Sequence, residues 1–545
     1  MNRASHSSIS NAPFISQVAH ERGPANWIVI AAMLLGVAWR IRYLVQLPVI
    51  ENEGAEYARM AVNIRDGVGP VGLHGVQQVY FTPLYSLVMG LASLLSHINI
   101  VMAGRLISFM AGCTGTVLTA RMTSSILGEK SAVLSAVFVA ASPYLIGASG
   151  VVLAEMTYTT FLVGSIWALW VASRRKGARY PAAAGVLFAL AHLTKPDAMV
   201  VAAGLLLIIL AIALRSTRER MVILSAFLLA YGLIISPYVA YLHHETGKWL
   251  VEGKGGANAV LAQRLAEGMS YKEATRGLDA TGNPVGVLLH PNQHTGELSL
   301  FQALKDHPEF LLHNLRQNAV ALVTGLRGTY GFAMVSLASI GLISLAFRRR
   351  WRELLYLGGA VGSQLFLSIV VYFNPRFLIA PGPLILGLAG HGLWTITEWI
   401  SHAFVRQRWQ RAIVIAMLTG DIVFREATAM AHLTTMYPES YQIELRQAGE
   451  WIRQEAGNGA VVMSDDTRVP FYAEATWVTL PLATTPQILE YADRYKVDYI
   501  VVPQRSDLAE ELMAQSATPD SSWVLIHVTE GGSGHEQAIF YHRRP

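Results

Sequence analysis

The stretch ENEGAEYARM (residues 51–60) is rich in carboxylates and follows directly on an apolar run at residues 26–47. That run is long enough to cross a hydrocarbon core of about 30 Å, so the acidic stretch emerges at a membrane surface. Asn52 can cap a helix that begins at Glu53, where a helix N-terminus favours an ionised carboxylate. The apolar stripe of this helix is Tyr57, Met60, Ala61 and Ile64. We therefore expect Glu53 in the first turn of a helix that lies on the membrane.

The composition indicates a polytopic α-helical membrane protein. Of the 545 residues, 52% are hydrophobic and only 14% are charged, and the mean hydropathy is +0.37. In a soluble protein of this size, about a quarter of the residues are charged. The formal charge of +5 requires no nucleic-acid partner, because the arginines cluster in short loops between apolar stretches. The single cysteine, Cys113, excludes an intrachain disulfide and a cysteine metal cluster.

The apolar stretches predict about eleven membrane spans. They lie at residues 26–47, 103–122, 131–147, 152–172, 181–194, 198–214, 220–242, 329–347, 354–372, 377–397 and 410–427. Lysine and arginine concentrate in short loops that should face the cytoplasm. These basic loops are 174–179, 215–220, 348–352 and 406–411. Residues 1–25 show no removable signal peptide, so we expect a cytoplasmic tail and a first span that stays as an anchor.

Residues 82–98 resemble a further span, but their apolar side chains lie on one face only. That face carries Leu84, Leu87, Val88, Leu91, Leu94, Leu95 and Ile98. The opposite face carries Ser86, Gly90, Ser93, Ser96 and His97. Such a helix suits the membrane interface, and leaving it out of the count puts all the basic loops on one side. The alternative is a true span combined with a different loop count elsewhere.

This topology divides the chain into a tail (1–25), a transmembrane domain (26–430) and an outer domain (431–545). The transmembrane domain carries two long outer loops, 48–102 and 243–328. A loop as long as 243–328 often forms a lid or an acceptor groove. In the outer domain, short strand-like and helix-like stretches alternate, which predicts a small α/β fold. The strands are expected within 460–466, 475–481, 497–504, 522–528 and 537–544, and helices at 439–457 and 485–496. We expect this domain to bind the acceptor or to cover the site.

Few charged residues lie on the short outer turns. Lys195 and Arg376 are the only cations there, and Glu155 stands at the outer end of its span. Charged groups at membrane depth are costly unless they are paired or hydrated, so each is a functional candidate and all should converge with Glu53. Structural roles are the alternatives: a solvated first turn around Glu53, a lysine extending to the interface, an arginine that pairs two helices, or a helix-capping Glu155.

Several motifs in one order resemble the GT-C glycosyltransferases that use polyprenyl-phosphate sugars. These include the protein O-mannosyltransferase-like group and the lipid A aminoarabinose transferases. The motifs are ENEGAEYARMAVNIRDG (51–67), YFTPLYSLVMGLASLL (80–95), GRLISFMAG (104–112), LAEMTY (153–158), LTKPDAM (193–199) and PRFLIAPGPLILGLAG (375–390). The resemblance covers residues 26 to 430, and it implies a multi-pass enzyme with its active site and C-terminal domain facing the periplasm or the outside of a bacterial inner membrane.

The resemblance also implies a reaction and its residues. The donor is a polyprenyl-phosphate sugar, and the acceptor is a hydroxyl or phosphate of a glycan, lipid or protein. Glu53 would act as the base of an inverting displacement, with Glu155 as a second catalytic carboxylate. The donor phosphate would be bound by Lys195, Arg376, Arg59 and Arg105, with further substrate contacts from Tyr57, Tyr85 and Asp197. No cofactor is certain. A divalent cation held by Glu155 is an alternative, and the weakest one, because neither carboxylate has a recognisable partner triad of ligands.

The match departs from the aminoarabinose branch at specific positions. Glu56 and Phe81 stand where that branch has an arginine and a lysine for the donor phosphate, and Glu53 replaces the more common aspartate. These departures argue against aminoarabinose as the sugar. A transporter or flippase of a lipid-linked or anionic solute is the runner-up, although alternating access needs ionisable groups near mid-membrane. A non-catalytic assembly subunit is the third reading, and it predicts that Glu53→Gln leaves activity unchanged.

Overall fold

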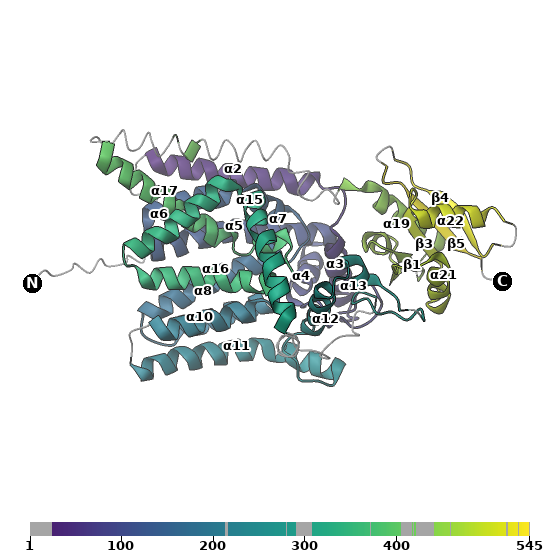
Figure 1. Cartoon of the computed structure of the whole chain (residues 1–545), viewed down its shortest axis with the longest axis horizontal. Helices are drawn as coiled ribbons and strands as arrows, with labels where there is room; N and C mark the ends of the chain where they lie inside the picture. Colours follow the sequence, from purple (N-terminus) through teal and green to yellow (C-terminus); the bar gives the residue numbers. More distant parts are fainter. Residues whose placement is uncertain are drawn as a thin grey trace, which may run out of the picture.

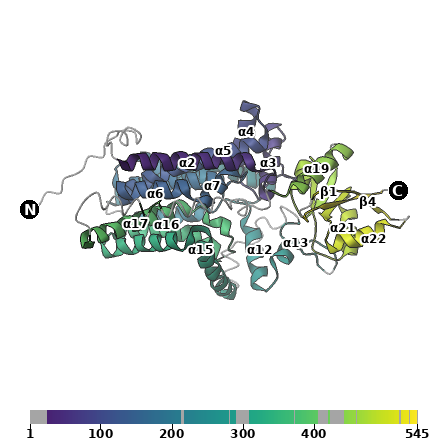
Figure 2. The same ribbon diagram turned by 90° about the horizontal axis from the view of Figure 1, so that it is seen from above.

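A computed structural model describes residues 24–543 except 213–215, 280, 290–307, 371, 405–416, 418, 421–440, 458, 519–520 and 532–533. Long helices form a bundle, and a small α/β domain lies at one end of it (Figure 1). Seen from above, short helices fill the space between the bundle and the sheet of this domain (Figure 2). The predicted tail (1–25) and the predicted span 410–427 fall largely outside the described residues.

The bundle helices coincide with every predicted span up to residue 397. They are α2 (Pro24–Gln46), α5 (Ile100–Leu127), α6 (Glu129–Ala141), α7 (Pro143–Gly150), α8 (Glu155–Arg174), α9 (Arg179–His192), α10 (Ala198–Ile212), α11 (Thr217–Thr246), α15 (Pro308–Phe347), α16 (Trp351–Val370) and α17 (Gly382–Phe404). Among the described residues, 5 helices are long and apolar enough to cross a membrane, or up to 6 when the bent pair α6–α7 counts as one. The predicted number of eleven spans is therefore not confirmed by this measure, because helices such as α9, with 14 residues, are too short.

A break between α6 and α7 bends the chain by 55°. Pro143 begins α7, where its missing N–H costs nothing but stops the hydrogen-bond ladder of α6. The guanidinium of Arg40 on α2 donates to the freed carbonyls of Ala140 at 3.2 Å and Val139 at 3.4 Å, and to Ser149 Oγ at 3.2 Å. The break directs the turn between α7 and α8 toward the outer loops.

Two short helices lie where the first outer loop was expected. Helix α3 (Asn52–Arg65) begins one residue earlier than predicted, since Glu51 is its N-cap and Asn52 is its first residue. The predicted capping role of Asn52 is therefore wrong. Helix α4 (Leu84–Ser96) has its polar face packed inward, with Ser86 Oγ donating to the carbonyl of Tyr57 at 2.8 Å. Its apolar stripe points outward, and Leu95 is 72% exposed.

The C-terminal domain contains a five-stranded sheet with the order β2-β1-β3-β5-β4. Its strands are β1 (Val461–Ser464), β2 (Thr476–Thr479), β3 (Tyr499–Pro503), β4 (Trp523–Val528) and β5 (Gln537–His542). β1 pairs in parallel with β2 and β3, whereas β5 is antiparallel to β3 and β4. The helices are α19 (Ile443–Ala456), α20 (Arg468–Tyr472), α21 (Thr485–Arg494) and α22 (Asp507–Ser516). The predicted small C-terminal sheet is confirmed, with each strand inside its expected stretch.

The outer loops of the bundle cover the β2 edge of this sheet. The backbone N–H of Trp477 donates to the carbonyl of Leu73 at 2.8 Å, and that of Leu482 donates to Arg276 at 2.8 Å. Between them, Thr479 Oγ1 donates to the carbonyl of Leu288 at 3.2 Å. An open strand edge invites pairing with other chains, so these contacts both close the edge and attach the domain to the bundle.

The basic loops gather at the other end of the bundle. Arg174 pairs with Glu353 at 3.4 Å, and Lys176 pairs with Glu219 at 3.2 Å, which brings the ends of α8, α11 and α16 together. Arg350 donates to the carbonyl of Ile126 at the end of α5 at 2.6 Å. The α/β domain and the described basic loops thus lie at opposite ends of the bundle (Figure 1).

Candidate active site

Four charged side chains from distant segments meet beside the start of α3, and we call them the charged tetrad: Glu53, Glu155, Lys195 and Arg376. Arg376 Nη2 lies 2.5 Å from Glu53 Oε2 and 2.7 Å from Glu155 Oε1. Lys195 Nζ lies 3.0 Å from the same oxygen of Glu155. The convergence expected from the positions of these residues on the outer turns is therefore present in the structure.

The tetrad is closed on one side and open on the other. The side chain of Glu155 is 5% exposed, whereas that of Glu53 is 39% exposed. The side chains of Lys195 and Arg376 have intermediate exposure, and Arg376 contacts both the buried carboxylate and the accessible one. The second oxygen of Glu155, Oε2, is buried and has no hydrogen-bond partner within the described part of the chain. A substrate can therefore approach the tetrad from the side of Glu53.

The sequence around Glu53 fastens the first turn of α3 to the turn between α7 and α8. Glu51 Oε2 accepts a hydrogen bond from the backbone N–H of Val152 at 2.7 Å. Gly54 lies so close to the same turn that a Cβ there would stand 2.5 Å from the carbonyl oxygen of Val152. Because Glu155 follows Val152 by only one turn of chain, these contacts bring the two carboxylates of the tetrad to the same place.

Arg376 belongs to a short 3-10 helix, η1 (Pro375–Leu378), that hydrogen bonds hold at both ends. The side-chain oxygen of Asn374 accepts from the N–H of Arg376 at 2.9 Å. Tyr144 OH donates to the carbonyl of Pro375 and Tyr330 OH to that of Leu378, each at 2.5 Å. The tyrosines come from α7 and α15, so the position of the guanidinium depends on the packing of the bundle.

Lys195 lies in the turn that follows α9. The Oγ1 of Thr82 donates to the carbonyl of Thr194 at 2.8 Å, and the N–H of Leu84 donates to that of Leu193 at 3.0 Å. The start of α4 therefore holds this turn in place. The ammonium of Lys195 also lies 5.7 Å from the ring centre of Phe377, next to Arg376.

The environment of Glu53 keeps its carboxylate ionised. Burial raises the pKa of Glu53, but the charges of Arg376, Lys254 and Lys195 and a hydrogen bond from Arg376 outweigh burial and lower the pKa from 4.5 to about 2. In this substrate-free arrangement Glu53 is therefore a stable ion-pair partner.

The neighbouring acid, Glu56, has a different surrounding. It is buried, and its carboxylate accepts from the N–H of Leu73 at 3.0 Å and from Gln78 Nε2 at 2.6 Å. Burial raises the pKa of Glu56 despite these hydrogen bonds. Glu51 is also buried, so the reading of this stretch as a solvated first turn is wrong for both residues. Of the acids in the opening stretch, Glu53 is the one that pairs with Arg376 in the charged tetrad.

Lys254 is a cation of the site that the sequence analysis missed. It precedes α12 (Gly255–Ala266), and its Nζ lies 4.8 Å from the ring centre of Tyr80 and 5.6 Å from that of Phe81. Its charge is among those that lower the pKa of Glu53. A Cβ on Gly253 would stand 2.0 Å from the carbonyl oxygen of Val79, so this glycine permits a close backbone approach.

Other residues predicted from the resemblance lie outside the tetrad. The Arg105 guanidinium donates to the carbonyls of Val49 at 3.1 Å and Leu44 at 3.5 Å. Arg59 Nη2 donates to Pro470 in the C-terminal domain at 3.4 Å. The structure therefore engages both arginines with backbone oxygens rather than with Glu53 or Glu155.

The two predicted tyrosines form an aromatic wall next to the tetrad. The Tyr57 ring packs edge-on against Tyr85, with 5.4 Å between ring centres, and against Phe81, with 5.1 Å. Tyr85 OH donates to the carbonyl of Gly104 at 3.0 Å.

Asp197, the remaining predicted substrate residue, immediately precedes α10 and is half-buried. The pKa of Glu252 is raised, mainly by burial, and the negative charge of Asp197 adds to this rise.

A metal ion has no evident ligand set in this site. The described residues contain no group of three or more His, Cys, Asp or Glu side chains that could hold one. The two carboxylates of the tetrad are instead each in contact with a cation. The residues present thus do not fit a divalent ion, and no chemical step is assigned to one.

The bundle, the short outer helices and the C-terminal domain define a fold shared with solved structures. The oligosaccharyltransferase of Archaeoglobus fulgidus in its apo form has a TM-score of 0.60 at 12% identity, over 87% of this chain and 69% of that chain. ArnT from Cupriavidus metallidurans in its apo state has a TM-score of 0.60 at 12% identity, over 95% of this chain and 98% of that one. ArnT bound to undecaprenyl phosphate has a TM-score of 0.56 at 10% identity and the same coverage. At identities this low, the structural likeness shows a shared fold.

A family model agrees with the fold. Residues 81–241, which include α4, Glu155 and Lys195, match the family described as dolichyl-phosphate-mannose-protein mannosyltransferase. No curated protein matches the chain. The matched family and the solved structures of this fold are GT-C glycosyltransferases, so the resemblance drawn from the sequence motifs is confirmed, and with it the expected glycosyltransferase fold.

Proposed function

We propose that the protein is an integral membrane glycosyltransferase that moves a sugar from a polyprenyl-phosphate donor to an acceptor hydroxyl or phosphate. The observation that carries this proposal is Arg376, which lies between the accessible carboxylate of Glu53 and the buried carboxylate of Glu155. A buried acid beside two cations anchors them, and an accessible acid beside them faces the substrate. This is an arrangement for binding an anion next to a base.

The cations serve the leaving group. When the acceptor oxygen attacks the anomeric carbon, the bond from that carbon to the phosphate oxygen breaks and its electron pair leaves with the polyprenyl phosphate. Preorganised donors stabilise such developing charge better than water does, because they need no reorganisation. Arg376, Lys195 and Lys254 are the cations whose charges lower the pKa of Glu53, which supports this role. They also make a general acid unnecessary.

Glu53 takes the proton of the acceptor. In the free site, the cations hold the pKa of Glu53 near 2. A donor phosphate brings negative charge to the same cations, and a like charge nearby raises the pKa of a carboxylate. Donor binding therefore turns Glu53 into a stronger base at the moment when an acceptor must be deprotonated. Direct attack from the side of Glu53 inverts the anomeric configuration.

Glu155 orients the site. Its Oε1 contacts Lys195 and Arg376 together, so the distance between the two cations depends on it. Its Oε2 has no hydrogen-bond partner among the described residues, which leaves it able to accept a hydrogen bond from the acceptor hydroxyl. Charged groups at membrane depth persist when they are paired in this way.

We place the site on the outer face of a bacterial inner membrane. The positive-inside rule puts the end of the bundle with Arg174, Lys176 and Arg350 in the cytoplasm, and the charged tetrad lies near the other end. The finer topology of about eleven spans, with α9 and α10 among them, belongs to this proposal. The outward apolar stripe of α4 suits the membrane interface, where the lipid tail of a donor would enter.

The test is transfer of radiolabelled sugar from polyprenyl phosphate in membranes that contain the wild type or Glu53→Gln. Protein, lipid and polysaccharide fractions are counted separately, which identifies the acceptor class. Glu490→Gln, an exposed acid on α21, is the matched control. We expect label in one fraction with the wild type and the control but not with Glu53→Gln. Equal labelling with all three proteins would remove Glu53 from the chemistry, and no labelling with a folded wild type would overturn the proposed activity.

A further inference from the structure

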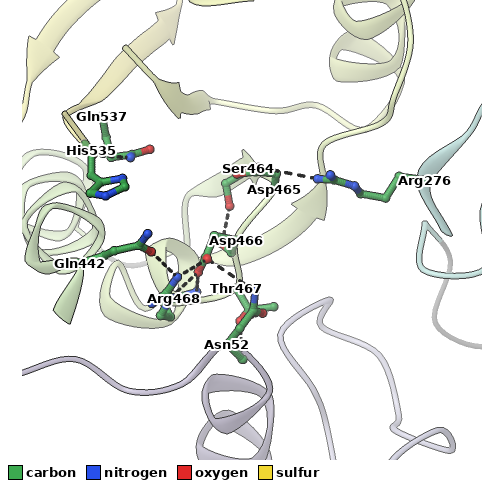
Figure 3. A network of polar contacts seen from close by, with 10 residues as sticks. All are labelled: Asn52, Arg276, Gln442, Ser464, Asp465, Asp466, Thr467, Arg468, His535 and Gln537. Carbon is green, nitrogen blue, oxygen red and sulfur yellow. Dashed lines mark hydrogen bonds and ion pairs between the residues drawn. The ribbon is translucent and has the colours of Figure 1, made fainter. Parts of the chain in front are cut away.

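A loop of the C-terminal domain rests on the first residue of α3, next to Glu53. This docking loop, residues 464–468, joins the end of β1 to the start of α20 and faces Asn52 of α3 (Figure 3). Thr467 Oγ1 lies 2.6 Å from the side-chain oxygen of Asn52 and 2.5 Å from its backbone oxygen. The hydroxyl thus holds the residue that immediately precedes the accessible carboxylate of the tetrad.

The docking loop is held rigidly. Arg468 donates to Asp466 through Nε at 2.8 Å and Nη2 at 2.6 Å, and the N–H of Arg468 donates to the same carboxylate at 2.9 Å. Nη2 also donates to Gln442 Oε1 at 2.9 Å, which ties the loop to the start of α19 (Figure 3). Arg468 is 2% exposed. Two-pronged arginine–carboxylate pairs fix geometry as well as adding energy, so Thr467 is presented in one orientation.

Further contacts hold the same turn of chain from both sides. On the side of the C-terminal domain, Tyr472 OH accepts from the N–H of Ile50 at 3.0 Å, and Arg446 donates to the carbonyl of Pro48 at 3.3 Å. On the side of the bundle, Glu51 binds Val152. Glu53 therefore directly follows a segment, residues 48–52, that is hydrogen-bonded both to the C-terminal domain and to the bundle.

The place of this loop within its own domain is informative. In α/β sheets, ligands bind in the crevice outside the carboxyl ends of parallel strands, where the chain turns to opposite sides. Here β1 lies between its parallel neighbours β2 and β3, and the loop after β1 faces Asn52. The part of the domain that would ordinarily receive a ligand thus receives the N-terminus of α3.

We propose that the C-terminal domain positions the transferase base, with Thr467 acting through Asn52 to set the orientation of Glu53 relative to Arg376. The inference rests on the proposed function. Thr467 is a positioning residue, since it contacts neither Arg376 nor the other cations in the described contacts. Catalysis depends on fixed geometry of the reacting groups, and a displacement of about 1 Å can cost about a hundredfold in rate. The docking contact therefore supports the chemical step rather than donor binding.

The experiment compares full-length Thr467→Val with Thr467→Ser and with Thr518→Val, an exposed threonine at the end of α22. The transfer kcat and the donor KM are measured separately for each. We expect Thr467→Val to lower kcat by about ten- to a hundredfold with donor KM unchanged, Thr467→Ser to restore kcat, and Thr518→Val to match the wild type. An unchanged kcat in Thr467→Val overturns the inference. So does an equal loss that serine does not rescue.

A second readout needs no turnover and separates failure of this inference from failure of the proposed function. Carboxyl footprinting with a carbodiimide and an amine, read by mass spectrometry, reports how accessible Glu53 is, with exposed Glu490 as an internal reference. We expect Thr467→Val to raise labelling of Glu53 but not of Glu490. Unchanged labelling of Glu53 contradicts the positioning role even if the wild type transfers no sugar. A wild type without transfer but with the labelling change leaves the contact established and overturns the assigned chemistry.

Discussion

The guanidinium of Arg376 donates to the carboxylate of Glu53 at 2.5 Å, although 323 positions separate the two residues in the chain. Arg376 also contacts Glu155, so a single side chain links the start of α3, the start of α8 and the turn before α17. This link exists because η1 and the turn between α7 and α8 are each fixed by their own hydrogen bonds. Perturbing any one of the three segments should disturb the other two.

Substitution of the proposed base should separate chemistry from binding. Glu53→Gln keeps the size of the side chain but removes its ability to take a proton. We expect kcat to fall by about 10²- to 10⁴-fold, which is the usual contribution of a general base, while the donor still binds. Single-turnover transfer with saturating donor measures the chemical step, and co-purification of labelled donor measures binding. A kcat within twofold of the wild type would contradict the role.

The neighbouring Glu56→Gln provides the contrast. Its carboxyl is buried with a raised pKa and has no contact with the tetrad, so an uncharged side chain is tolerated there. One of its two acceptor oxygens becomes a donor, which should cost about 1 kcal/mol of stability. We expect near-normal transfer with a slightly lower Tm. Loss of transfer comparable to that of Glu53→Gln would show that Glu56 belongs to the active site.

Removal of Arg376 should affect both stability and donor affinity. Arg376→Ala leaves the buried Glu155 with Lys195 as its remaining charged partner. A buried acceptor that loses a partner costs about 1–3 kcal/mol, so the Tm should fall. The donor KM should rise, because a cation that we propose to bind the donor phosphate is gone. Arg376→Lys keeps the charge but cannot bridge two carboxylates with one planar group, so we expect partial recovery of KM only. Thermal unfolding in detergent and transfer kinetics report the two effects.

Lys254→Ala should weaken donor use without disturbing the fold. Lys254 lies over the rings of Tyr80 and Phe81 at the edge of the site. We expect a higher donor KM and an unchanged Tm. Lys248→Ala is the control, because Lys248 is an exposed cation of the same outer segment. Equal kinetics of the two variants would exclude Lys254 from the donor site.

The thermal stability of the protein should depend on pH through the ionisation of Glu53. The pKa of Glu53 is lowered from 4.5 to about 2 by the surrounding cations, despite burial. A carboxyl with a lowered folded-state pKa stabilises the protein above its unfolded pKa, and this stabilisation is lost as the pH falls toward the folded pKa. The wild type should therefore lose Tm between about pH 4.5 and 2 more steeply than Glu53→Gln. Parallel curves for the two proteins would contradict the pairing with Arg376.

The local sequence was sufficient for the elements of this protein. Apolar runs placed the bundle helices, and alternation of apolar residues placed the strands of the C-terminal domain, because periodicity is a property of neighbouring residues. The scarcity of charge on the outer turns was sufficient to select Glu155, Lys195 and Arg376. The one-sided pattern of residues 82–98 likewise predicted the outward apolar stripe of α4.

Only the tertiary structure decided which partner each polar group found. Asn52 was expected to cap a helix but instead meets Thr467, 415 positions away. The alternative reading of a solvated first turn would have left Glu56 in water, but its carboxylate binds Gln78. The charge of Lys254 acts on Glu53, although no sequence pattern assigned this residue to the site. Hydrophobic periodicity encodes which face of an element is buried. It does not encode which distant donor or acceptor will form a hydrogen bond with a given polar side chain. Those partners are set by the packing of the bundle against the C-terminal domain.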